Sequence, residues 1–170
     1  MAADATNGLV IRSAKRDDVP LILQFVRGLA EYENLAHECK ATEAQLEHTL
    51  FGARPVAEVV IAYRDHVAAG FALFFHNYST FLARPGIYLE DLFVEPAHRG
   101  FGVGRALLAH LAALAVEREC GRLEWSVLDW NADAIRFYER LGARAMNDWT
   151  IYRVTGDALL KLATSTSEPP

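Results

Sequence analysis

The distribution of hydrophobic and polar positions predicts strands and helices in a definite order along the chain. Six short runs rich in apolar residues predict strands: Leu9–Ala14, Ala57–Tyr63, Val67–Asn77, Ile87–Val94, Leu123–Leu128 and Thr150–Val154. Only the polar triplet Arg64-Asp65-His66 separates the second run from the third, so these two strands should form a hairpin.

Apolar residues three or four positions apart predict four helices and a short C-terminal turn. The first helix follows Asp17 and Asp18, with Pro20 in its first turn. A shorter helix starts at Thr42, which has Gln45 three residues later. The remaining predictions are a long helix at Gly104–Glu119, a helix from Asn131 to Leu141 that Gly142 ends, and a turn at Leu159–Leu162. This order of elements predicts an α/β protein, with a mixed sheet covered by helices on both faces. Strands and helices do not alternate along the chain as they do in a doubly wound fold.

Length and composition favour a single soluble domain. The chain has 170 residues, and we expect one domain over 9–163, with a disordered N-terminus at 1–8 and a flexible tail at 164–170. The net charge of −5 argues against a nucleic-acid partner. We read no signal peptide and no apolar run long enough for a membrane span. Cys39 and Cys120 lack metal or redox spacing, which favours the reducing cytoplasm.

The most specific local motif is a glycine loop, Arg99-Gly100-Phe101-Gly102-Val103-Gly104, between a predicted strand and the long helix. Backbone N–H groups at a helix start, approached closely through glycine, suit a pyrophosphate. A loop without a ligand is one alternative. A dinucleotide fingerprint would need a third glycine where Arg105 or Leu107 stands, and a Walker loop would need Gly-Lys-Ser/Thr. The loop matches the R/Q-x-x-G-x-G/A pattern of the GNAT acetyltransferases at Arg99, Gly102 and Gly104.

Further segments resemble the same family. Asn131 opens a helix that contains Phe137-Tyr138 and ends in Leu141-Gly142-Ala143, as in the second GNAT signature. The segments 29–33, 88–94 and 127–131 resemble the diamine acetyltransferases, a group that includes the spermidine/spermine and thialysine enzymes. The Leu128-Asp129-Trp130-Asn131 run is closer to the thialysine branch. The resemblance extends from about Val10 to Leu162.

This resemblance implies a GNAT-type, mostly antiparallel sheet, acetyl-CoA as co-substrate, no metal, and a homodimer that acetylates a small amine. Its acetyl-CoA arm would lie beside the backbone of the central strand. The implied cofactor-binding residues are Leu92, Phe93, Val94, Arg99, Gly100, Phe101, Gly102, Val103, Gly104, Arg105, Asn131, Ala134 and Tyr138. The resemblance also implies Tyr32, Glu33 and Glu90 as amine-binding residues, although Tyr32 and Glu33, at the end of a helix, have a solvated tip as the alternative interpretation. Asp129 and Asp148 are further candidates, which would add negative charge to the amine site.

Two acids within one apolar strand are the candidate proton acceptors. An alkylammonium with a pKa of about 10.4 is only ~0.1% neutral near pH 7.4, so the site must take its proton. The resemblance places Glu90 there as the base, and burial or neighbouring Asp91 would have to raise its pKa. Asp91 has two interpretations, a structural salt-bridge partner or a functional acid. Simple alternation puts Tyr88, Glu90 and Leu92 on one face of the strand.

Tyr138 is the candidate general acid, because a phenol can donate a proton to the leaving sulfur. The alternative is a core tyrosine with a satisfied hydroxyl. The short turn at Arg64–His66 and the stretch Met146-Asn147-Asp148 depart from the relatives where both regions can border the amine site. These departures leave the identity of the amine open.

Other chemistries find less support. His37-Glu38-Cys39 has no partner pair with zinc-like spacing, and His66, His76, His98 and His110 form no recognisable hydrolase triad. Two further hypotheses remain, a non-catalytic acyl-CoA sensor and a dinucleotide oxidoreductase. Intact Glu90 and Tyr138 argue against the first, and the glycine spacing argues against the second.

Overall fold

The computed structural model describes residues 8–165, which divide into two compact units, the first ending at Ser126 and the second beginning at Val127. The first unit contains β1 (Leu9–Ser13), α1 (Val19–Tyr32), α2 (Glu43–Phe51), β2 (Glu58–Arg64), β3 (Val67–Ser79), β4 (Arg84–Val94), α3 (Val103–Glu117) and β5 (Leu123–Trp125). The second contains α4 (Ala132–Arg140) and α5 (Gly156–Thr164). Most of the ends predicted to be disordered or flexible, 1–7 and 166–170, lie outside the described residues.

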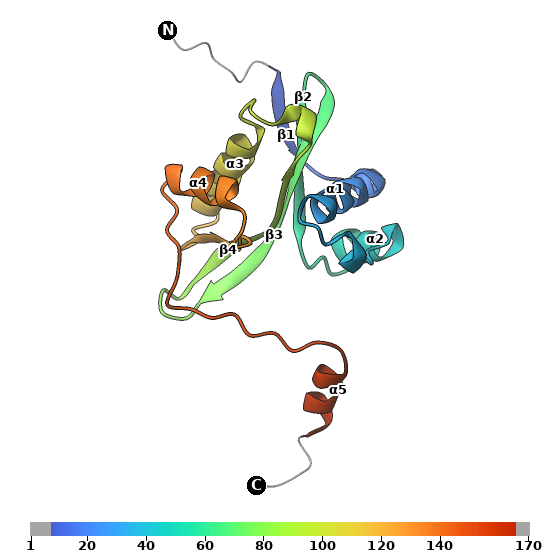
Figure 1. The fold of residues 1–170 in the computed structure, drawn as a ribbon, viewed down its shortest axis with the longest axis vertical. Coiled ribbons are helices and arrows are strands. Elements are labelled where there is room, and N and C mark those ends of the chain that lie inside the picture. The colour runs from blue at the N-terminus through green and yellow to red at the C-terminus, as the bar shows by residue number, and fades with distance from the viewer. Residues whose placement is uncertain (1–7, 166–170) are drawn as a thin grey trace. The chain divides into compact units, whose positions relative to one another are not determined.

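The five strands form one sheet in the order β1-β2-β3-β4-β5. Neighbours are antiparallel except for β4 and β5, which run parallel. Within this unit, α1 and α2 cover one face of the sheet and α3 covers the other (Figure 1). The predicted fold class is therefore confirmed, and so is the hairpin, since Arg64 pairs with Val67 across a two-residue turn.

The sheet face under α1 carries the larger aromatic core. Phe25 of α1 is fully buried and stacks on Phe71 of β3, with ring centroids 5.4 Å apart. Phe93 of β4 joins them at 6.2 Å from Phe25. Burial of such side chains stabilises the fold by roughly 1.5–3 kcal/mol each. This core fixes the C-terminal half of β4 against α1.

A β-bulge in β4 overturns the simple alternation expected for this strand. Leu73 of β3 pairs with Asp91, but the next residue, Phe74, pairs with Leu89, so Glu90 is the extra residue. Because cross-strand partners share a face, Asp91 lies with Leu73 on the α1 side, whereas Leu89 lies with Phe74 on the α3 side.

The same bulge separates residues that alternation had grouped. Tyr88 packs against its partner Phe75 on the α1 side, with ring centroids 5.2 Å apart, whereas Leu92 pairs with Ala72 on the α3 side. The prediction that Tyr88 and Leu92 share a face is therefore wrong. The extra residue at the bulge resets the alternation between them.

The second unit begins as predicted and then departs from the prediction. The Asn131 side chain accepts a hydrogen bond from the N–H of Ala134, which starts α4, and Gly142 adopts φ +89° just after the helix. The strand predicted at Thr150–Val154 is absent, because these residues pair with no strand in the described part of the chain. The short turn predicted at Leu159–Leu162 lies within the helix α5.

Candidate active site

The glycine loop is an open cradle of backbone amides at the start of α3. Gly100 and Gly102 both adopt φ +81°, a backbone conformation that residues with a Cβ rarely take. Apart from the chain neighbours of each glycine, no atom of residues 8–165 lies within 4 Å of the position where either Cβ would stand. Gly102 is the N-cap of α3 and provides no side-chain cap, so the first amides of the helix lack a side-chain acceptor. This geometry fits a pyrophosphate.

Arg99 links the loop to the end of α1. Its Nε donates a 2.9 Å hydrogen bond to the carbonyl oxygen of Val94, and its guanidinium carbon lies 4.7 Å from the ring centroid of Tyr32. A residue predicted for the cofactor therefore contacts one predicted for the amine. The remaining loop residues include Val103, which is buried, and Arg105, which is exposed on α3.

The backbone of β4 beyond Leu89 is open on the side opposite β3. β5 pairs only with Ile87, Tyr88 and Leu89, and no other described strand pairs with β4 on that side. The stretch Leu92–Val94 therefore has no strand partner along this edge among the described residues, and the Val94 carbonyl oxygen accepts from Arg99 Nε. An open strand edge fits an extended ligand added as a strand. Phe93 directs its ring into the α1 core, so its side chain is not available at this edge.

Asp91, Glu90 and Glu33 form an acidic cluster in the first unit. Burial and, to a smaller extent, the charges of Glu90 and Glu33 together raise the pKa of Asp91 to about 6. Burial also raises the pKa of Glu33 at the end of α1. Glu90 is exposed at the bulge. No cation forms an ion pair with any of the three among residues 8–165, so the salt-bridge interpretation of Asp91 finds no support.

Sequence reasoning named Glu90 as the acid to be perturbed, and the structure shows the large shift at Asp91. The two positions differ in burial, because Asp91 pairs with Leu73 on the α1 side whereas Glu90 is the exposed extra residue of the bulge. The adjacency of two acids was a visible signal. Glu33 approaches Asp91 from the end of α1 through tertiary packing, and no signal in the sequence indicated that approach.

The second unit holds the other predicted site residues. Asn131, Ala134 and Tyr138 recur at a spacing of three and four, so they share one face of α4. The rings of Phe137 and Tyr138 have centroids 5.3 Å apart. Asp129 lies just before this helix, and Asp148 follows it. Their roles therefore stay predictions.

No group of three or more His, Cys, Asp or Glu side chains that could hold a metal ion occurs within residues 8–165. No helix in that range has the length and apolar character needed to cross a bilayer.

The comparisons with known proteins agree with this geometry. Residues 26–143 match the acetyltransferase (GNAT) family. The chain is 37% identical to a thialysine N-epsilon-acetyltransferase of Bos taurus, over 91% of this chain and 97% of the relative. It is 36% identical to an L-ornithine N5-acetyltransferase of Arabidopsis thaliana, over 88% of this chain and 85% of the relative.

Solved structures give the same fold. An integron cassette protein from the mobile metagenome of V. cholerae superposes with a TM-score of 0.79 at 27% identity, over 93% of this chain and 99% of that chain. An aminoglycoside acetyltransferase from an uncultured soil sample superposes with a TM-score of 0.75 at 16% identity, over 89% of this chain and 99% of that chain, which supports the fold alone. The chain belongs to the GNAT family of acetyltransferases. Membership implies acetyl-CoA as the co-substrate.

Proposed function

We propose that this enzyme transfers the acetyl group of acetyl-CoA to a primary amine of a small cationic substrate, such as a polyamine, thialysine or a lysine-like amine. The observation that carries the proposal is the acidic cluster of Glu33, Glu90 and Asp91, which has no ion-pair partner among the described residues. Uncompensated carboxylates attract an ammonium group and then need to accept its proton. The named relatives, which acetylate thialysine and ornithine, support the same substrate class.

Glu90 and Asp91 accept the proton as a coupled pair in this proposal. An acid with its pKa near the working pH is the better base, which favours Asp91 at about 6. Glu90 raises that pKa through its charge, and its exposed position at the bulge suits it to meet the incoming ammonium. Glu33, on α1, binds a second and more remote positive group of the substrate.

The chain's own residues hold the cofactor in the same proposal. Acetyl-CoA supplies an acetyl group activated as a thioester. The loop amides from Gly100 to Gly104 hold its pyrophosphate, and the open β4 backbone at Leu92–Val94 pairs with its extended arm. Tyr138 of α4 donates a proton to the departing sulfur, and Asn131 and Ala134 line the same face of that helix.

Further features of the proposal rest on the resemblance and on composition. The enzyme is a cytoplasmic homodimer, uses no metal, and acts on a small amine with neither a nucleic acid nor a membrane as partner. Asp129 and Asp148 add negative charge near the amine.

A thiol-release assay with a panel of amines tests the reaction. Spermidine, thialysine, lysine, ornithine and a simple monoamine are each mixed with acetyl-CoA, and product is identified by mass. Amine-dependent release of coenzyme A with an acetylated product supports the proposal. Tight acetyl-CoA binding without turnover for any amine would instead indicate the acyl-CoA sensor.

Calorimetry with Gly104→Val tests the loop separately. A β-branched side chain at the second residue of α3 obstructs a close phosphate, so acetyl-CoA binding should weaken by about tenfold or more. A melting curve of the variant checks that the fold is retained. Unchanged affinity in a folded variant would remove the loop from the cofactor site.

A further inference from the structure

The glycine loop carries a second arginine–aromatic contact that comes from outside the loop. The guanidinium carbon of Arg64, at the end of β2, lies 3.7 Å from the ring centroid of Phe101. Phe101 stands between Gly100 and Gly102, the two residues with φ +81°. The Arg64 guanidinium is therefore held directly against the tip of the loop.

The two-residue hairpin turn puts Arg64 in this position. Asp65 and His66 adopt φ +51° and +67°, as the two central residues of a type I′ turn do. Arg64 and Val67 pair immediately before and after them, so Arg64 is the last residue of β2. Arg64 therefore stands where the chain reverses, and its contact with Phe101 places its side chain beside the loop.

The donors of Arg64 are less committed than those of Arg99. Arg99 donates its Nε to Val94 and lies over Tyr32. The polar contact of Arg64 within residues 8–165 is Nε to Asp65 Oδ2 at 3.8 Å, which is too long for a hydrogen bond. The side chain of Arg64 is 30% exposed. A guanidinium that stacks on an aromatic ring keeps its in-plane N–H donors available for a phosphate.

We propose that Arg64 is a further cofactor-binding residue, which contacts a phosphate group of the nucleotide portion of coenzyme A. This inference rests on the proposed function of the glycine loop and assigns to it a cation from a distant strand. The phosphate is either the pyrophosphate, which would lie over the loop amides, or the 3′-phosphate on the ribose. Both present the same oxygens to a guanidinium.

Calorimetry with coenzyme A and with dephospho-coenzyme A tests the proposal on Arg64→Gln. We expect Kd for coenzyme A to rise about tenfold, the size of one lost charge-assisted contact. If dephospho-coenzyme A is unaffected by the variant, the contact is with the 3′-phosphate. If both ligands weaken equally, it is with the pyrophosphate. Unchanged Kd for both ligands in a folded variant would overturn the proposal.

Three companion variants separate charge, stacking and general surface effects. Arg64→Lys keeps a charge without the planar guanidinium, so its loss of affinity for coenzyme A should be smaller than that of Arg64→Gln. It replaces Arg64→Gln as the test if that variant fails to fold. Phe101→Leu removes the stacking surface and should weaken binding less than Arg64→Gln does. Arg84 is an exposed arginine at the start of β4. Arg84→Gln makes the same charge change away from the loop and should leave Kd unchanged.

The outcomes distinguish this inference from the proposed function. Equal losses in Arg64→Gln and Arg84→Gln would show only a general effect of net charge and would overturn it. If the unaltered protein binds no coenzyme A, the glycine-loop assignment itself fails. If it binds coenzyme A and Arg64→Gln binds it equally well, only the role of Arg64 fails.

Discussion

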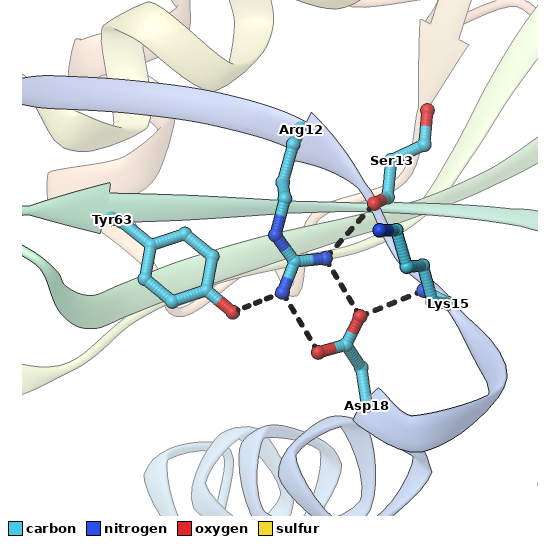
Figure 2. Close-up of polar contacts among 5 residues, drawn as sticks. All are labelled: Arg12, Ser13, Lys15, Asp18 and Tyr63. Atoms are coloured by element: carbon cyan, nitrogen blue, oxygen red, sulfur yellow. Dashed lines mark hydrogen bonds and ion pairs between the residues drawn. The ribbon is translucent and has the colours of Figure 1, made fainter.

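Two carboxylates on the α1 side of the sheet show opposite electrostatics. Asp18, just before α1, receives hydrogen bonds from Arg12 Nη1 at 2.7 Å and Nη2 at 2.8 Å and from the Lys15 N–H at 2.7 Å, while Arg12 Nη2 also donates to Tyr63 at 2.6 Å (Figure 2). The hydrogen bond from Arg12 lowers the pKa of Asp18 below its usual range. Asp91 has no such partner among the described residues, and its pKa rises to about 6.

The difference separates a carboxylate that stabilises the fold from one that is available for chemistry. A paired carboxylate favours its ionised form and stabilises the state in which the pair exists. A buried carboxylate without an ion-pair partner lowers the stability of the fold when it is ionised. Such destabilising groups are found most often at functional sites, where a ligand interacts with them. Asp18 therefore belongs to the architecture of β1 and α1, whereas Asp91 belongs to the proposed amine site.

The largest effect should come from the acidic pair. Glu90→Gln and Asp91→Asn should each lower kcat about 10²-fold for every amine, the typical contribution of a proton acceptor. Because the two acids act as a unit, the double variant should lose little more than either single one. Steady-state kinetics on all three variants check this. Losses that multiply would show two independent roles.

Asp18→Asn should show the opposite pattern. The variant removes an acceptor from a half-buried bidentate contact and should lower the free energy of unfolding by about 1–3 kcal/mol. kcat should stay within about twofold, since Asp18 belongs to neither proposed site. Urea unfolding and steady-state kinetics on the same preparation make the comparison. A large loss of kcat at unchanged stability would contradict the structural role of the network.

Asp91→Asn should be more stable than the unaltered protein at neutral pH. The folded pKa of about 6 lies above the ordinary value of 3.8, so the folded state binds the proton more tightly than the unfolded state. Stability from this group is full below about pH 4 and is lost as the pH rises through 6. The variant should gain about 2–3 kcal/mol above pH 7 and nothing below pH 4.

Urea titrations of both proteins across this range measure the pH dependence. Asp18 and Glu58 have lowered pKa values in both proteins, and their effects cancel in the difference. A gap that is constant with pH would show that Asp91 is not the titrating group.

Glu33→Gln should have the smallest effect, and a selective one. The loss of a remote binding charge should raise KM for diamines about fivefold, because one ion pair contributes about 1 kcal/mol. KM for monoamines should stay nearly unchanged. Arg27, on the same helix, provides the matched control: Arg27→Gln changes charge without touching the acidic cluster. An equal rise for monoamines would place Glu33 at the reacting amine instead.

The sequence predicted most of the helices and strands, because capping and turn residues act on their immediate neighbours in the chain. Thr42 and Gln45 form the predicted capping box of α2, with Thr42 Oγ1 accepting from the Gln45 N–H at 3.3 Å. The glycine loop was recognised from its glycines, its place between a predicted strand and helix, and its match to the GNAT pattern. The positive φ angles of Gly100 and Gly102 are what such glycines provide.

Features that depend on pairing between distant segments were not predictable in the same way. Alternation along β4 takes no account of the partner strand, so it missed the bulge at Glu90. The strand predicted at Thr150–Val154 had a suitable apolar pattern, but a strand also requires a neighbour, which the pattern does not identify. The pKa of Asp91 depends on burial and on Glu33 from another element, and neither is visible in the residues around it.

The pH dependence of kcat/KM for a diamine tests the central claim most directly, in the unaltered enzyme, Asp91→Asn and Glu90→Gln. The account predicts a rise with an apparent pKa near 6 in the unaltered enzyme, which disappears in Asp91→Asn. In Glu90→Gln the rise should move to lower pH, because the charge that helps to raise the pKa of Asp91 is gone. An unchanged rise near pH 6 in Asp91→Asn would contradict the account, since the proton acceptor would then lie elsewhere.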